Sequence, residues 1–123
     1  MSSIYLLLSL LVCHYLADYC LTFPSLIRAK ADGRRLLPVL QHACVHGSLM
    51  GVCLFISGVE MGDALWLVGF EVATHFVIDV SKTLASLHFP ILADRGRKPY
   101  WMAYGLDQLL HQVVVVMMWM WAG

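Results

Sequence analysis

Four pairs of ionisable residues, each pair spaced by four positions, lie in four apolar stretches of the sequence. Residues four apart lie on one face of a helix, one turn from each other. Each pair can therefore present two side chains to the same neighbour, and imidazoles and carboxylates are common ligands of divalent transition metals. The pairs are His14 and Asp18, His42 and His46, His75 and Asp79, and Asp107 and His111.

The positions of these residues along their stretches predict two layers. When each stretch is counted from the end that we place at the cytoplasmic face, the pairs lie at matching depths. One helical turn separates the layers by about 6 Å. One layer holds His14, His46, His75 and His111, and the layer nearer the cytoplasm holds Asp18, His42, Asp79 and Asp107.

The three carboxylates in these stretches are costly to insert in a membrane, at about 2.5–3.5 kcal/mol each. Lys82 is the one basic residue inside a stretch, so protein ion pairs offset this cost only in part. A divalent cation offsets it directly, since structural zinc sites contribute roughly 10–16 kcal/mol. We therefore predict one or two transition-metal ions, zinc, manganese or iron, with all eight residues as candidate ligands. The alternative is a metal-free network of His–Asp hydrogen bonds.

Three further residues lie beside the candidate ligands and form our candidate catalytic set. Glu71 lies one turn from His75 and could be a ligand, a general base or a hydrogen-bond acceptor for an imidazole. Gln108, next to Asp107, could hydrogen-bond a ligand. Lys82 could bind a substrate anion, or it could extend to the lipid headgroups.

The apolar stretches predict an all-α, four-helix transmembrane bundle. Apolar residues make up 60% of the chain and charged residues 13%, against about 45–50% and about 25% in soluble domains. Each stretch is long enough to cross a hydrocarbon core of about 30 Å. We expect a single integral membrane domain over residues 1–123, in which four cysteines pack as small buried hydrophobes. The stretches are Ser3 to Phe23, Val39 to Ser57, Ala64 to Leu84, and Ala103 to Trp121.

Charges in the connectors predict the orientation. The first and third connectors are basic, whereas the second carries Glu60 and Asp63 and no basic residue. The positive-inside rule places the basic connectors in the cytoplasm and both termini outside. The order of the pairs further suggests two helical hairpins of similar design. The basic residues assigned to topology in the first connector are Arg28, Lys30, Arg34 and Arg35.

These motifs resemble a family of small bacterial and phage integral membrane proteins known only as a domain of unknown function. The family pattern is HxxxD with a downstream Lys, then HxxxH, HxxxDxxK and DQxxH, which this chain carries from His14 to His111 with Lys30 downstream of the first motif. A Gln commonly follows the first motif in the family, where this chain has Thr22. More loosely, the chain is similar to membrane-bound metal-dependent hydrolases. The resemblance implies a location in a bacterial inner membrane and a metal, and it supplies no activity.

The favoured function is a metal-dependent hydrolase acting on a lipid or lipid-linked substrate at the cytoplasmic leaflet. One alternative is a metal or proton transporter, which the apolar outer half of the bundle disfavours. Another is a non-enzymatic interaction or phage–host module with a structural metal site, and a haem-binding bundle is a remote fourth. The zero net charge and the lack of a basic motif exclude nucleic acid as an expected partner, which leaves membrane lipids. The oligomeric state stays open.

Overall fold

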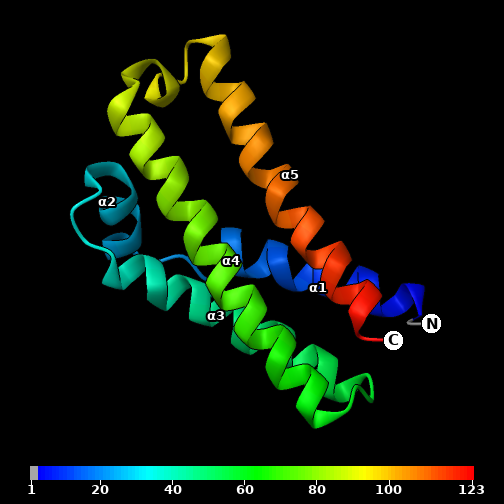
Figure 1. Cartoon of the computed structure of the whole chain (residues 1–123). Coiled ribbons are helices and arrows are strands. Elements are labelled where there is room, and N and C mark those ends of the chain that lie inside the picture. The colour runs from blue at the N-terminus through cyan, green and yellow to red at the C-terminus, as the bar shows by residue number, and fades with distance from the viewer. Residues whose placement is uncertain (1–2) are drawn as a thin grey trace.

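The computed structural model describes residues 3–123, and within them every regular element is a helix. This confirms the all-α prediction. Figure 1 shows the helices as they cross. The elements are α1 (Ile4–Tyr15), the π-helix η1 (Leu16–Cys20), α2 (Pro24–Asp32), α3 (Leu37–Ile56), α4 (Met61–His88), the 3₁₀-helix η2 (Pro90–Ala93) and α5 (Lys98–Trp121).

Two helices, α3 and α4, are long and apolar enough to cross a membrane. The segments Ile4–Cys20 and Pro24–Asp32 pass the same test only together, as one span bent by 85°. Helix α5 has 24 residues, so it is long enough, but the polar residues around Asp107 lower its hydropathy. The structure thus contains two or three candidate spans, and four complete spans stay a prediction.

The sequence predicts one helix from Ser3 to Phe23, but in the structure this stretch is interrupted. After α1 the backbone widens into η1, where the amide of Leu21 donates to the carbonyl of Leu16 at 3.0 Å, a bond between residues five apart. Pro24 then opens α2, a position where proline is favoured because its missing N–H needs no partner. The first connector is therefore largely helical, and α2 packs against α3 and α4.

Gly33 ends α2 and fixes its place beside α4. Its φ of 66° is in the left-handed region, which glycine adopts readily at helix ends. A Cβ at this position would overlap the Leu87 side chain. The turn therefore favours glycine because of its left-handed backbone conformation, and a Cβ would in addition force the Leu87 side chain of α4 to move.

Helices α3 and α4 pack closely through two glycines spaced by four. A Cβ on Gly47 would lie 2.5 Å from Val72 Cγ2, and one on Gly51 would lie 2.8 Å from Val68 Cγ2. A small-xxx-small pattern of this kind lets two helix backbones approach each other. This contact brings His46 of α3 near the face of α4 that carries His75.

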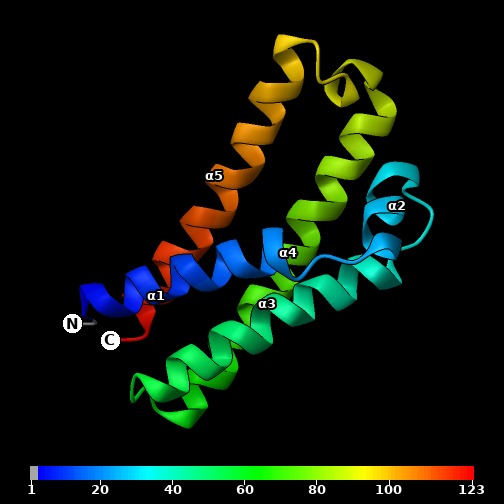
Figure 2. The same cartoon turned by 180° about the vertical axis from the view of Figure 1, so that it is seen from behind.

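Two apolar cores lie on either side of the polar residues. The larger joins the N-terminal half of α1, the C-terminal halves of α3 and α5, and the start of α4. The start of α1 and the end of α5 lie side by side there (Figure 2), and Trp119 Nε1 donates to the Ser3 carbonyl at 3.0 Å. The smaller core joins Leu26 and Ala29 of α2 to Val39 of α3. The polar side chains are thus enclosed between two apolar layers, and the larger core corresponds to the apolar outer half that the sequence predicts.

Candidate metal centre

The four histidines of the layer predicted to lie farther from the cytoplasm converge from α1, α3, α4 and α5. The rings of His46 and His75 have centroids 3.8 Å apart, those of His75 and His111 are 4.3 Å apart, and those of His14 and His46 are 5.0 Å apart. None of the four side chains is more than about 6% exposed. The four histidines that the sequence places at one depth are therefore close together in the structure, with His75 at the centre.

Asp18, on the π-helix η1, is surrounded by three imidazoles. Its Oδ1 lies 3.1 Å from His42 Nε2 and 3.0 Å from His46 Nε2, and its Oδ2 lies 3.2 Å from His14 Nε2. Single π-turns occur often at functional sites, because the wider turn redirects a side chain. Here that turn carries the carboxylate that joins α1 to α3.

Asp79 on α4 pairs with Lys30, a residue that the sequence analysis interpreted as a determinant of membrane orientation. Lys30 Nζ of α2 lies 2.8 Å from Asp79 Oδ2, and the carboxylate is 3% exposed. His75 Nε2 lies 3.3 Å from the same oxygen, and His111 Nε2 lies 3.6 Å from Oδ1. The interpretation of Lys30 as a topology residue alone is therefore incomplete. The signal was present in the family pattern, which contains a lysine downstream of HxxxD.

Asp107 lies apart from the groups that could hold a metal. Lys82 Nζ donates to Asp107 Oδ2 at 3.2 Å and lies 5.0 Å from the centre of the Tyr104 ring. Gln108 Nε2 lies 3.3 Å from the same carboxylate and 3.4 Å from Asp18 Oδ2. Lys82, expected to bind an anion or reach the headgroups, thus neutralises Asp107, and about a third of its side chain stays exposed.

Glu71 lies on the other side of the His75 ring from Asp79. Its Oε1 is 3.4 Å from His75 Nδ1 and 3.9 Å from His46 Nδ1, and the residue is 2% exposed. This position is compatible with a metal ligand or with an acceptor that orients His75. It places one carboxylate at each nitrogen of the central imidazole.

Two tyrosines that the sequence analysis did not single out lie beside the site. The hydroxyls of Tyr19 on η1 and Tyr104 on α5 are hydrogen-bonded to each other. Tyr19 follows Asp18 in the sequence, and the Tyr104 ring lies 5.0 Å from Lys82 Nζ. No spacing rule within the sequence links two tyrosines that lie on different helices.

Three groups of side chains have ligand atoms within 4.8 Å of one another. In a tetrahedral zinc site with bonds of about 2.0–2.1 Å, neighbouring ligand atoms lie roughly 3.3 Å apart. The separations of about 3 Å around Asp18 Oδ1 are close to that value. His75 belongs to all three groups, so the groups are overlapping alternatives. They are His14, His46, Glu71 and His75; Asp18, His42, His46 and His75; and His75, Asp79 and His111.

Unsatisfied polar atoms concentrate at the same place. Within residues 3–123, ten buried side-chain nitrogen and oxygen atoms make no hydrogen bond of good geometry, although Asp79 Oδ2 among them lies 2.8 Å from Lys30 Nζ, and all ten belong to the histidines and carboxylates of this site. His111 is the most informative case. Its Nδ1 lies 2.7 Å from the Asp107 carbonyl oxygen, which can only accept, so Nδ1 carries the hydrogen. In the neutral ring Nε2 is then a bare lone pair facing Asp79, an arrangement that a cation between them stabilises.

An apolar cavity of about 320 Å³ opens beside Asp107, between α4, η2 and α5. Lys82 and Asp107 are its charged lining residues, and Ile78, Leu92 and Leu106 contribute apolar wall. Its volume is at the lower end of the range of about 300–1,000 Å³ for small-molecule sites. An apolar chain could therefore lie next to the polar site.

Comparison with known proteins identifies the family but no function. Searches of curated proteins and of solved structures found no significant match. A family model described as "Protein of unknown function (DUF3307)" matches residues 6–123, which include all the residues of the site. The chain belongs to this DUF3307 family of proteins of unknown function.

Proposed function

We propose that this chain is a membrane-embedded metal-binding protein. The observation that carries the proposal is the convergence of Asp18, His42, His46 and His75, whose ligand atoms all lie within 4.8 Å of one another. A buried polar atom without a partner costs about 1–3 kcal/mol. Several such atoms together would cost a large part of the stability of a typical domain, about 5–15 kcal/mol. A bound divalent cation would satisfy several of them at once.

The ligand groups suggest where ions would lie. The groups containing Asp18 or Glu71 share His46 and His75, and either supplies four protein ligands. The group of His75, Asp79 and His111 supplies three, which leaves a coordination position open. Three protein ligands with an open position are typical of catalytic zinc sites, whereas four are typical of structural ones.

We further propose that the activity is hydrolysis of a lipid or lipid-linked substrate. A bound divalent metal would supply a Lewis acid for this reaction. The apolar cavity beside Asp107 would hold part of the substrate chain, and the exposed part of Lys82 would contact an anionic group. Glu71 would orient His75 or accept a proton, and Gln108 would hold Asp18 and Asp107 in place.

A non-enzymatic structural site is the second candidate, because the imidazoles are deeply buried and His46 is completely buried. Transport is less well supported, because the larger apolar core contains no ionisable residue that could relay an ion to the outer end. For the membrane we propose four spans, with both termini outside and the segments around Arg34 and Arg95 in the cytoplasm of a bacterium.

The test is metal analysis of detergent-purified protein, followed by a hydrolysis assay on phosphate-ester lipids. We expect one or two equivalents of a transition metal. Lys82→Ala should retain the metal and lose hydrolysis, because Lys82 belongs to none of the three ligand groups. Protein that is folded and metal-free after purification in zinc-supplemented medium would refute the metal site. Metal-loaded protein without hydrolysis would favour the structural metal site over the hydrolase.

A further inference from the structure

Two cavities between α4 and α5 join into one groove that leads away from the metal centre. The cavity of about 320 Å³ described above and a second one of about 330 Å³ share three lining residues, Val77, Ile78 and Leu110. The second cavity continues to Ala73 on α4 and Val113 on α5. Figures 1 and 2 show these two helices running side by side from the end that η2 joins. We call the combined space the α4–α5 groove.

The spacing of the lining residues explains why the groove follows both helices. Positions three or four apart share one face of a helix. On α5 the lining residues recur at this spacing, as Ala103, Leu106, Leu110 and Val113. Small side chains, Ala73 and Ala85 on α4 and Ala103 on α5, leave room between larger apolar ones. The groove is therefore encoded along one face of each helix.

The groove is at least as long as one leaflet of a bilayer is thick. It extends from Ala73 to Ser86 on α4, a rise of about 20 Å at 1.5 Å per residue. Half of a hydrocarbon core of about 30 Å is about 15 Å. A helix about 10 Å across and 20 Å long would occupy roughly 1,600 Å³, more than twice the volume of both cavities together. An extended acyl chain therefore fits within the groove, and a helix of a partner protein does not.

One end of the groove carries the polar groups that bind a lipid head. Lys82 lines it there, and Lys82 Nζ donates to Asp107 Oδ2 at 3.2 Å. An ammonium has three hydrogens, so it can donate to a second acceptor, and about a third of the Lys82 side chain is exposed. Ser86 lines the same cavity one turn farther along α4. Among the residues that the structure describes, none that lines the second cavity is charged, so the two ends differ in polarity.

The connector at the polar end adds positive charge. Leu92 of η2 lines the groove, and the residues that follow it include Arg95, Arg97 and Lys98 against one acidic residue, Asp94. A surplus of basic residues at a membrane surface attracts anionic lipid heads. An anionic head at this end of the groove would therefore lie in a favourable potential.

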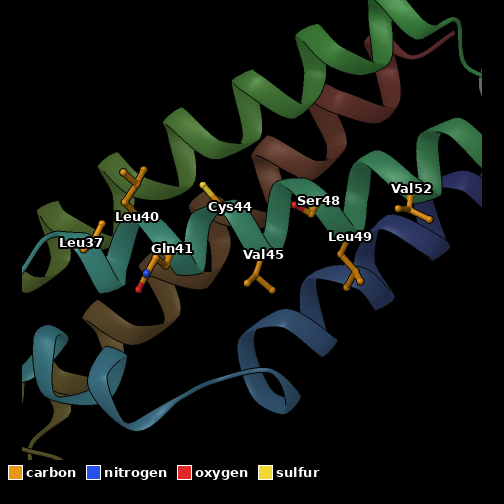
Figure 3. Close-up of a pocket in the computed structure, with 8 residues that line it drawn as sticks. All are labelled: Leu37, Leu40, Gln41, Cys44, Val45, Ser48, Leu49 and Val52. Atoms are coloured by element: carbon orange, nitrogen blue, oxygen red, sulfur yellow. The ribbon is translucent and has the colours of Figure 1, made fainter.

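The largest groove of the structure lacks this combination. It has a volume of about 540 Å³ and lies along the outward face of α3 (Figure 3), and none of the described residues that line it is charged. Cys44 is one of them. The sequence analysis expected all four cysteines to be buried, but Cys20 and Cys44 are exposed. The α3 groove offers no cation to an anionic head, so it supplies the control for the second experiment below.

We propose that the α4–α5 groove binds one long acyl or alkyl chain of a lipid with an anionic phosphate head. The phosphate lies at Lys82, and the chain extends toward Val113. The inference rests on the proposed function and deepens it, because it names the substrate class. Lys82 is three residues from Asp79 on α4, so a head bound there reaches the edge of the metal centre while the chain stays in the bilayer.

The first experiment measures binding of single-chain ligands to the full chain by native mass spectrometry from a neutral detergent. Hexadecyl phosphate should bind as one molecule per chain, and hexadecyl maltoside, which has the same chain and a neutral head, should bind less. Lys82→Ala should weaken hexadecyl phosphate roughly 10-fold, because a hydrogen bond to a partly exposed charge is at the lower end of the range for charged groups. Arg28→Ala is the control, since Arg28 is exposed on α2 and does not line the groove. Equal binding by the two variants, or equal binding of the two ligands, would overturn the proposal.

The second experiment tests the path of the chain. Val113→Trp places a bulky side chain at the apolar end of the groove and should weaken hexadecyl phosphate by about 5-fold or more, the equivalent of an overpacked site. Octyl phosphate, with a chain half as long, should bind this variant as it binds the wild type, which also shows that the variant is folded. Val52→Trp is the control, because Val52 is an exposed valine in the α3 groove. Equal losses in the two variants, or an equal loss for both phosphates, would show that the chain does not follow the α4–α5 groove.

These results can be separated from those that test the metal site, because binding is measured without hydrolysis. Hexadecyl phosphate that binds metal-free protein with the expected dependence on Lys82 and Val113 would support the groove and refute only the metal site. Metal-loaded protein that binds no hexadecyl phosphate would refute the groove alone.

Discussion

Removal of the His75 imidazole should affect metal binding more than removal of any other ligand. His75 is the one residue shared by the three groups that could hold an ion. Its Nδ1 faces Glu71 at 3.4 Å and its Nε2 faces Asp79 at 3.3 Å. His75→Ala therefore removes a ligand from every possible position of the ion, whereas His111→Ala removes one from the three-ligand group only.

The size of the effect follows from the number of ligands. An apparent zinc affinity of roughly 10–16 kcal/mol divided over four ligands gives about 2.5–4 kcal/mol per ligand. His75→Ala should thus weaken binding by roughly two to three orders of magnitude, since 1.4 kcal/mol is a factor of ten. Asp107→Asn should leave the affinity nearly unchanged, because Asp107 pairs with Lys82 and belongs to no ligand group.

The assay is competition with a chromophoric chelator, combined with elemental analysis of the purified variants. His88→Ala is the matched control, because His88 is exposed on the same helix, far from the site. His75→Gln leaves less empty space than His75→Ala and should disturb the fold less. Circular dichroism checks that each variant is folded. If folded His75→Gln binds metal as tightly as His88→Ala, the overlap of the three groups does not describe the site.

Two other predictions concern packing and topology. Gly47→Ile should lower the free energy of unfolding by about 1–3 kcal/mol, because it forces a side chain into the contact between α3 and α4. Gly69→Ile is the control, because a Cβ at Gly69 meets nothing within 4 Å. Equal melting temperatures of the two variants would contradict the close packing. Cysteines introduced at Arg34 and Asp63 should react with a membrane-impermeant thiol reagent from opposite sides of the membrane, and labelling of both from one side would refute the proposed orientation.

The proximity of the histidines could be predicted because it depends on fixed helix geometry. The rise per residue is constant, so depth counted along an alternating chain places His14, His46, His75 and His111 at one level. The sequence pattern also fixed which residues share a face, since a spacing of four returns a side chain to the same side. These rules use only distances along one helix, and they held for all four rings.

The partners of the carboxylates could not be predicted in this way. Depth gives the level of Asp107 but not the direction in which its side chain points, and in the structure it meets Lys82. The pair of Lys30 and Asp79 depends on the 85° bend after η1, which returns α2 to the bundle. That bend results from Pro24 and from tertiary contacts of α2, and a hydropathy pattern contains no information about it.

The two lysine pairs change the number of ions that the site should hold. Lys30 with Asp79 and Lys82 with Asp107 are neutral pairs, which leaves Asp18 and Glu71 as the carboxylates without a lysine. Their two negative charges balance one divalent ion, and the groups that contain them share His46 and His75. A second ion at Asp79 would lie close to the ammonium of Lys30, and like charges at such distances repel strongly in a low-dielectric interior.

Lys30 should therefore limit the metal content. We expect one equivalent in the wild type and close to two in Lys30→Ala at saturating metal, because the variant leaves Asp79 free to hold a second ion with His75 and His111 while Asp18, His42 and His46 hold the first. Lys98→Ala is the control, since Lys98 is exposed at the start of α5. The measurement is stoichiometry by elemental analysis after gel filtration. Two equivalents in the wild type, or no gain in folded Lys30→Ala, would show that charge balance does not set the number of ions.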